Sequence, residues 1–406
     1  MRNLIFFDDS ERDHLLPFTY SRPVCELRFG ILKIREKWEH DLVGKGSYIT
    51  QDYLAEKYPI NISNDNYVIS GSVIPNERLV KLISQLNFNE ALLSNEDLIA
   101  ARLNKQQFDN LMNNGPIDEL VGYELTTTPV RKINSLPDLL KDRKEEFEID
   151  FERITKGRKS AAIPKGVNAI HPEKIFIEEG AQISHSVLNA TEGSIYIGKN
   201  VLIMEGSFLR GPIGLGEGTV AKMGTYMYGP LATGPHCKIG GELNDVTMIG
   251  YSNKTHHGFL GHSYIGEWCN IGAGSSNSNL KNTYSNVRLW NYPSAEPLDT
   301  GLLFCGLFMA DHTKCGINTT FNTGTVVGYA SNLYGPIMHP RFIPSFSWGG
   351  GTDWETHKPQ GALNTAKSMM MRRGLTLSAA DEKIFIEIFN ISSPYRVWEN
   401  KGKKTS

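Results

Sequence analysis

The stretch Ile197-Gly-Lys-Asn-Val-Leu-Ile-Met-Glu-Gly-Ser-Phe-Leu-Arg-Gly-Pro-Ile-Gly-Leu-Gly-Glu-Gly-Thr-Val-Ala-Lys-Met-Gly-Thr-Tyr-Met227 repeats an apolar or small residue every six positions. The repeating residues are Ile197, Ile203, Leu209, Leu215, Ala221 and Met227. A mostly apolar period of six with glycines at the turns is typical of a hexapeptide parallel β-helix. Each hexad then forms one strand and one corner, and the repeating side chain stacks inward. An ordinary glycine-rich β-sandwich offers no reason for this spacing.

The repeat has limits along the chain. Residues 158–351 hold 29 of the 39 glycines, so this segment differs from both its flanks. After an irregular interval Ile265 and Ile271 resume the spacing, but the next two steps fall on polar Asn277 and Thr283. Residues 284–304 break the period altogether. We expect them to form a loop or hairpin that leaves the coil, as functional segments often do.

Three regions follow from these patterns. Residues 1–155 alternate strand-like and helical runs, which predicts an α/β domain. Residues 160–350 form the β-helix, and residues 355–406 form a helical C-terminal segment with a capping-box signal at Ser378 and Asp381. The charged stretch 141–150, just before the repeat, reads as a solvated helix or linker.

Composition narrows the function classes. With 42 Lys and Arg against 44 Asp and Glu, the net charge is −2, which argues against nucleic acid or an anionic membrane as the partner. The longest apolar run, 301–310, is too short to cross a bilayer, and no secretory signal is visible at the N-terminus. The five scattered cysteines contain no CxxC motif. We therefore expect a cytoplasmic protein with free thiols.

The segment Leu15-Leu-Pro-Phe-Thr-Tyr-Ser-Arg-Pro23 resembles the L-x-P-L-T-x-x-R-P stretch of sugar-phosphate nucleotidyltransferases. The resemblance marks Thr19, Arg22 and Glu26 as nucleotide-binding candidates. Three family features are missing, however. No glycine lies between Asp9 and Pro17 to cradle a triphosphate, Val24 replaces a phosphate-pairing lysine, and Ser72 replaces a magnesium-binding aspartate. We expect a reduced, inactive domain that could still hold a sugar nucleotide.

The segment Phe259-Leu-Gly-His-Ser-Tyr-Ile-Gly-Glu-Trp-Cys-Asn-Ile-Gly-Ala-Gly274 is similar to Y-V-G-D-S-x-I-G-E-x-x-N-x-G-A-G. That motif belongs to the bifunctional uridyltransferase/glucosamine-1-phosphate acetyltransferase family. The resemblance implies a left-handed β-helix, a homotrimer with sites between neighbouring β-helices, acetyl-CoA as co-substrate, and a sugar phosphate or sugar nucleotide as acceptor. It implies no metal for the acyl transfer itself.

The same resemblance assigns roles to single residues. His256 matches the general base, and histidine suits that role because its pKa lies near working pH. Asn270 matches a sugar contact, Ala273 and Asn279 match acyl and coenzyme A contacts, and Lys314 matches a basic residue near the coenzyme phosphates. Arg210 resembles a phosphate-binding arginine. A second phosphate lysine, expected after Glu242, is Asn244 here, and Lys222 or Lys254 could compensate. His257 and His262 are substitutes for the base, although His262 is better explained by a hydrogen bond to a corner carbonyl.

Other functions remain open at this point. His257 and His262 are five residues apart, and with His236 they could bind zinc as in γ-carbonic anhydrases. An active sugar-1-phosphate nucleotidyltransferase would use Arg22 and Glu26. A non-catalytic sugar-nucleotide-binding protein would need neither chemistry. For the asparagines, a structural ladder at the corners is an equally good explanation.

Overall fold

The computed structural model describes residues 1–113, 120–335, 337–351 and 353–400. The backbone divides into two compact units. The first contains Met1–Leu15, Ser21–Leu27 and Leu32–Ser135. The second contains Leu16–Tyr20, Arg28–Ile31 and the chain from Leu136 onward. Within the described residues, no helix is both long and apolar enough to cross a membrane.

The first unit is an α/β fold around a six-stranded sheet in the order β2-β1-β3-β6-β5-β7. Strands β1, β2 and β3 run parallel, while β6 lies antiparallel to β3 and β5. The strands are β1 Arg2–Phe7, β2 Gly44–Ile49, β3 Asn66–Ser70, β5 Glu90–Ser94, β6 Asp97–Leu103 and β7 Val121–Glu124, with a small pair β4 Val73–Ile74 and β8 Arg131–Lys132. The helices are α1 Ile34–Leu42, α2 Glu77–Gln85 and α3 Lys105–Met112.

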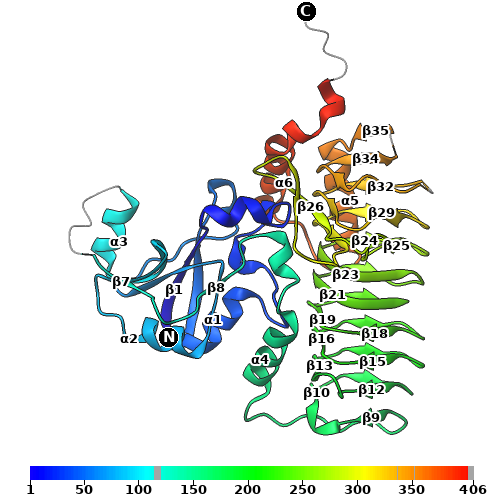
Figure 1. The fold of residues 1–406 in the computed structure, drawn as a ribbon, viewed down its shortest axis with the longest axis horizontal. Helices are drawn as coiled ribbons and strands as arrows, with labels where there is room; N and C mark the ends of the chain where they lie inside the picture. The colour runs from blue at the N-terminus through cyan, green and yellow to red at the C-terminus, as the bar shows by residue number, and fades with distance from the viewer. Residues whose placement is uncertain (114–119, 336, 352, 401–406) are drawn as a thin grey trace, which may run out of the picture. The chain divides into compact units, whose positions relative to one another are not determined.

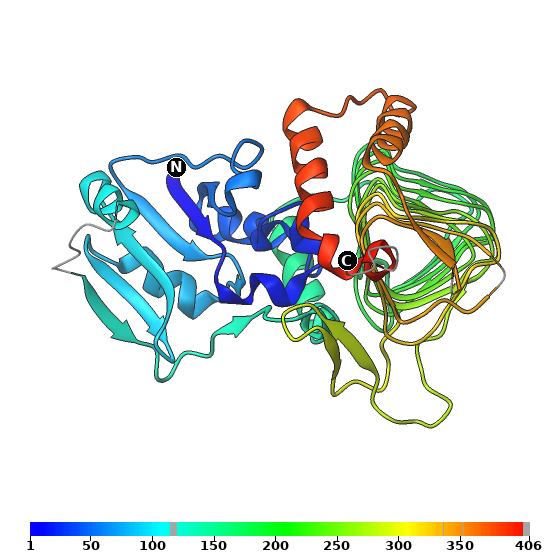
Figure 2. The same ribbon diagram turned by 90° about the horizontal axis from the view of Figure 1, so that it is seen from above.

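The second unit is a parallel β-helix with three faces, whose coils superpose in Figure 2 and stack in Figure 1. Face 1 contains β9 Asn168–Ile170, β12 Val187–Asn189, β15 Phe208–Arg210, β18 Tyr226–Tyr228, the first halves of β21 Glu242–Gly250 and β23 Phe259–Glu267, then β25 Ser276–Asn277 and β30 Thr320–Phe321. Face 2 contains β10 Ile175–Ile177, β13 Ile195–Ile197, β16 Ile213–Leu215, β19 Leu231–Thr233, the second halves of β21 and β23, β28 Leu307–Met309, β31 Thr325–Val327 and β33 Phe342–Ile343. Face 3 contains β11 Gln182–Ile183, β14 Leu202–Ile203, β17 Val220–Ala221, β20 Lys238–Ile239, β22 Asn253–Lys254, β24 Asn270–Ile271, β29 Lys314–Cys315, β32 Asn332–Leu333 and β34 Ser347–Gly350.

The predicted hexad residues form the core of this β-helix. All six from Ile197 to Met227 are at most 1% exposed, and Ile265 and Ile271 continue the same cluster. Polar Asn277 does not end the stack. Its side chain is buried, accepting from the Gly261 amide at 2.8 Å and donating to the Gly261 carbonyl at 3.0 Å. A buried amide is tolerated because both of its ends are hydrogen-bonded.

The excursion from the coil is a hairpin, as the broken period predicts. Strands β26 Arg288–Asn291 and β27 Glu296–Asp299 pair antiparallel. At the other end, β35 Asp353–Thr356 turns back on β34, and two helices follow, α5 Pro359–Met371 and α6 Ala379–Ile391. The predicted capping box at Ser378 and Asp381 is present.

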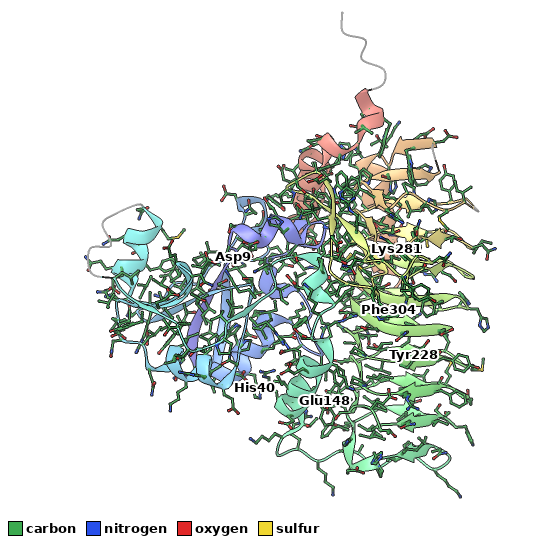
Figure 3. The ribbon with its side chains drawn as sticks, in the orientation of Figure 1. Asp9, His40, Glu148, Tyr228, Lys281 and Phe304 are labelled. Atoms are coloured by element: carbon green, nitrogen blue, oxygen red, sulfur yellow. The ribbon has the colours of Figure 1, made fainter. Side chains whose placement is uncertain are left out.

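The charged stretch before the repeat is a packed helix and not a solvated one. Helix α4, Arg143–Thr155, buries Phe147 and lies against face 2. Arg143 donates to the Thr247 hydroxyl at 3.1 Å, and Glu148 (Figure 3) accepts from the Ser194 amide and hydroxyl. These charged side chains therefore hydrogen-bond to face 2, and the helix covers the apolar strands of that face.

Truncating one of the repeating core side chains tests whether the repeat points into the β-helix. We expect Ile265→Ala to destabilise the β-helix by about 2–5 kcal/mol, because Ile265 is fully buried and its neighbours cannot close the cavity. The matched control Ile386→Ala, at a residue of α6 that is 39% exposed, should cost less than about 1 kcal/mol. Urea unfolding followed by circular dichroism measures both. Equal costs would contradict the inward assignment.

Candidate functional site

A groove of about 730 Å³ runs along face 3 beside the C-terminal end of α5. Its floor is an outward row in which Lys238, Asn253, Asn270 and Lys314 occupy equivalent positions of successive coils. Residues from α5 and its end form the other wall. The lining is completed by Lys222, Thr255, His256, Thr365, Ser368, Met369, Arg372 and Arg373.

Arg373 fixes the end of α5 to the β-helix. Its guanidinium donates to the His236 carbonyl at 2.5 Å and to the Asn253 side-chain oxygen at 2.8 Å. Such a fork of donors holds two acceptors in a fixed geometry. The wall of the groove is therefore tied to the same row of residues that forms the floor.

The groove is strongly basic. Its lining includes three lysines and two arginines, and no aspartate or glutamate among the described residues that line it. Desolvation lowers the pKa of Lys238, and the nearby charges of Arg373, Lys222 and Arg372 lower it further. Burial lowers the pKa of Lys314 to about 8, while its ammonium donates to the His312 carbonyl at 2.7 Å. Cations that repel one another without a carboxylate favour a bound anion.

His256 lies on the exposed corner that follows β22, at the edge of this groove. Among the described residues none hydrogen-bonds to its ring, so both ring nitrogens are open to a ligand. The corner rests on the two glycines of the preceding coil. A Cβ on Gly240 would lie 2.2 Å from the Thr255 carbonyl oxygen, and one on Gly241, whose φ is +76°, would lie 2.6 Å from that of His256. Only glycine permits this close approach.

The groove thus brings together three of the residues assigned from the sequence, His256, Asn270 and Lys314, and also Lys222. Lys254 is elsewhere. It points into the β-helix, is 1% exposed, and cannot touch a ligand in the groove. His257 is exposed on the same corner as His256, but it does not line the groove.

Asn279 and His262 form a separate cluster at the corner between faces 1 and 2. The Asn279 amide lies 2.9 Å from His262 Nδ1, and His262 Nε2 lies 3.5 Å from Asp245. Phe304 (Figure 3) stacks on the imidazole at 5.0 Å between centroids. Burial lowers the pKa of His262. Both ring nitrogens therefore have neighbours from the chain, although not the corner carbonyl expected from the sequence.

Ala273 and the zinc candidates also lie outside the groove. Ala273 sits on the corner above His256, where its carbonyl accepts from the Asn318 amide at 2.7 Å. His236, His257 and His262 occupy three different corners of the β-helix. The described part of the chain contains no cluster of three His, Cys, Asp or Glu side chains placed for a metal ion.

Arg210, Glu242 and Asn244 lie on face 1. A second hollow of about 470 Å³ is lined by Arg210 and Glu242 together with Phe208, Tyr226 and Tyr228 (Figure 3). Arg210 pairs with Glu192 at 2.6 Å, and Glu242 accepts from the Tyr228 hydroxyl at 2.5 Å. Asn244 continues the row of Arg210 and Tyr228. These residues form a site of their own, on a different face from His256.

In the first unit the chain's own side chains surround Glu26. It accepts from Lys33 at 2.8 Å, Arg35 at 2.5 Å and the Tyr48 hydroxyl at 2.7 Å. Burial alone would raise the pKa of Glu26, but Lys33 and Arg35 outweigh it and hold the pKa at about 2. Arg22 is buried, and Thr19 is buried in the second unit.

A polar cluster missed by the sequence reasoning lies at the carboxyl ends of β1 and β3. Ser72 and Ser70 donate to Asp9 at 2.6 and 2.8 Å, and Lys132 lies 3.7 Å from the same carboxylate (Figure 3). Lys238, Arg372 and Arg373 of the groove were missed as well. Adjacent arginines at the end of a predicted helix were the only signal, and nothing in the sequence indicated that this helix returns to face 3.

The comparisons with known proteins come to the following. Residues 4–159 match a family model described as sugar nucleotidyl transferase. A search of curated proteins found no match. The UDP-N-acetylglucosamine acyltransferase LpxA of Bacteroides fragilis 9343 is similar over 60% of this chain and 87% of its own, at 16% identity and a TM-score of 0.33. The UDP-N-acetylglucosamine acyltransferase of Campylobacter jejuni is similar over 60% of this chain and 86% of its own, at 13% identity and a TM-score of 0.27. The polySia specific acetyltransferase NeuO is similar over 57% of this chain and 97% of its own, at 10% identity and a TM-score of 0.22. These values are too low to transfer an activity.

The groove should bind a diphosphate more weakly as pH rises. ADP keeps its charge between pH 7 and 9, because its phosphates are already ionised above about pH 6. Lys314 loses its proton as pH rises through about 8, so the ADP affinity of the protein should fall over that range. Lys314→Met should weaken binding about tenfold at pH 7 and flatten the pH dependence.

Isothermal titration calorimetry measures both effects. Lys199→Met removes an exposed corner lysine that does not line the groove and is the matched control, with unchanged ADP affinity. A Lys199→Met variant that loses as much affinity as Lys314→Met would show that ADP does not bind in the groove.

Proposed function

We propose that the protein is an acyl-CoA-dependent transferase that acylates an amino-sugar, sugar-phosphate or sugar-nucleotide acceptor, with His256 as the general base. One observation carries the proposal. The residue assigned as base lies at the edge of a groove whose five cations can hold phosphate groups, and Asn270 and Lys314 line that groove too. An exposed imidazole to which no described residue hydrogen-bonds is free to take a proton from the acceptor substrate.

In this reaction His256 alone accepts the proton and gives it back. The acceptor's amine or hydroxyl attacks the thioester carbonyl while His256 takes the proton from the attacking atom. The tetrahedral intermediate collapses with loss of the coenzyme A thiolate, and His256 returns the proton to that sulfur. The groove's lysines and arginines hold the phosphates, so that binding energy positions the thioester beside the base. Acetyl-CoA is the proposed donor, and no step needs a metal.

We propose a homotrimer in which face 1 of one copy meets its neighbour. Large apolar side chains are exposed on this face and on the adjoining corner, and two of them, Phe208 and Tyr226, stack at 5.7 Å. The exposed set is Ile170, Phe208, Met223, Tyr226 and Ile317. An exposed apolar row of this kind is typical of a subunit interface. Such contact would bring Arg210 and Glu242 of one copy near the corners of another.

For the first unit we propose a reduced nucleotidyltransferase-like domain without turnover. Both carboxylate oxygens of Glu26 already accept from Lys33, Arg35 or Tyr48, and the residue is buried, so it is not presented to a nucleotide. The family match over residues 4–159 favours the opposite candidate, an active nucleotidyltransferase. Release of pyrophosphate from a nucleoside triphosphate and a sugar 1-phosphate would establish that activity.

Removing the base should nearly abolish acyl transfer. His256→Ala should lower the rate of coenzyme A release, with acetyl-CoA and a panel of amino-sugar phosphates, by roughly 10²–10⁴-fold. His185→Ala is the matched control, because His185, like His256, is an exposed histidine at a corner of the β-helix, and it does not line the groove. It should retain the wild-type rate. A large loss in His257→Ala with little in His256→Ala would move the base role to His257.

Charging face 1 should dissociate the trimer. Tyr226→Asp places a carboxylate in the proposed apolar contact, and the sedimentation mass should fall from three times the 45.3 kDa chain to one. Val43→Asp changes a residue that is 70% exposed in the first unit and should leave the mass unchanged. A wild-type protein that sediments as a monomer would refute the assembly.

A further inference from the structure

Lys254 is the one charged residue of the inward row on face 3. Its neighbours in that row are apolar, with Ile239 before it, and Cys315 and Leu333 further along. Only 1% of Lys254 is exposed. An ammonium group removed from water is costly, and it is retained in a core only where it has a task or a strong partner. Within the described residues, no carboxylate pairs with it.

The partners of the ammonium are two corner carbonyls. Lys254 Nζ donates to the His256 carbonyl, and it lies 3.4 Å from the Gly240 carbonyl, to which it also donates. The first belongs to the corner that carries the proposed base, and the second to the corner of the preceding coil. A buried carbonyl needs a donor, and among the described residues no backbone amide donates to the His256 or Gly240 carbonyl. From inside the coil, Lys254 therefore restrains the backbone of the corner that carries His256.

Close packing against glycines also fixes this corner. The Thr255 and His256 carbonyls lie so close to Gly240 and Gly241 that a Cβ on either would collide with them, at 2.2 and 2.6 Å. Gly258, at φ +120°, closes the corner against the Ser275 carbonyl, which a Cβ would approach to 2.1 Å. The backbone of His256 is thus held between a glycine cradle and a lysine clamp, while its ring stays exposed.

We propose that Lys254 is a positioning residue, which sets the backbone of His256 and so aims its imidazole at the thioester. This inference rests on the proposed function. Lys254 touches no substrate and stands apart from the groove's cations, so its loss should affect the chemical step more than ligand binding. Burial also lowers the pKa of Lys254 to about 8, as expected for an ammonium held by carbonyls alone.

Lys254→Met tests the proposal, because it keeps the length of the side chain and removes the donor. We expect kcat to fall on the order of 10–100-fold, since small misplacements of a catalytic group cost rates of this order. The KM for acetyl-CoA and the ADP affinity should stay within about threefold of wild type, because the groove's cations are untouched. Lys199→Met, at an exposed corner lysine, is the matched control with wild-type kcat.

Gly240→Ala disturbs the corner through the preceding coil and leaves the Lys254 side chain itself unchanged. It should also lower kcat with little change in KM. Wild-type kcat in a folded Lys254→Met protein, or a rise in KM that matches the fall in kcat, would overturn the proposal. A Met variant that does not fold would overturn it as well, by making Lys254 a residue of the fold.

Hydrogen–deuterium exchange separates this inference from the proposed function. Amides of residues 255–258 should exchange faster in Lys254→Met than in wild type and in Lys199→Met, whatever the reaction is. If His256→Ala keeps full activity, the proposed function fails while the exchange result still reports on the clamp. Unchanged exchange at these residues would refute the clamp itself.

Discussion

The inward stacking of one side chain per hexad is the constraint on which the second unit depends. The triangular coil is narrow, so each strand contributes only one or two residues to a core that runs along the whole axis. Parallel register then places equivalent positions of successive coils about 4.8 Å apart, both inside and outside. Every outward position therefore becomes a row. Lys238, Asn253, Asn270 and Lys314 form such a row because the hexads beneath them are in register.

A row of this kind also explains the electrostatics of the groove. Cations in one row repel each other, and the two asparagines between Lys238 and Lys314 separate the charges along the floor. Arg373 reaches the same row through Asn253, so the fifth charge of the groove is held by a neutral partner instead of a carboxylate. If carboxylates paired with these cations, the empty groove would be more stable, but its charges would already be neutralised and it would bind an anion weakly. Because no carboxylate is among the described residues that line the groove, its cations are available to an anion.

The sequence predicts the architecture well because period six has one structural cause. Ile197 and its successors are buried as the repeat requires, and the hairpin at 288–299 lies where the repeat breaks. The resemblance assigns roles to His256, Asn270 and Lys314, which line one groove, and also to Arg210 and Asn279, which lie elsewhere on the β-helix. Because the resemblance implies sites between neighbouring copies, the roles of these residues stay predictions. A motif gives positions along the chain, whereas the face of a residue depends on the number of residues in each corner.

Two residues lie in environments that the sequence did not indicate, each for a different reason. Lys254 looked like a ligand contact, yet it occupies an inward position, because alternation within β22 leaves only Asn253 facing out. Arg373 could be placed only once the length of α5 and the return of the chain to face 3 were known. Local sequence propensity predicts neither the corner geometry nor the return of the chain to face 3, since both follow from tertiary packing. The hexad repeat therefore predicts which residues form the core of a β-helix. Which outward residues lie together can be predicted only from the complete three-dimensional path of the chain.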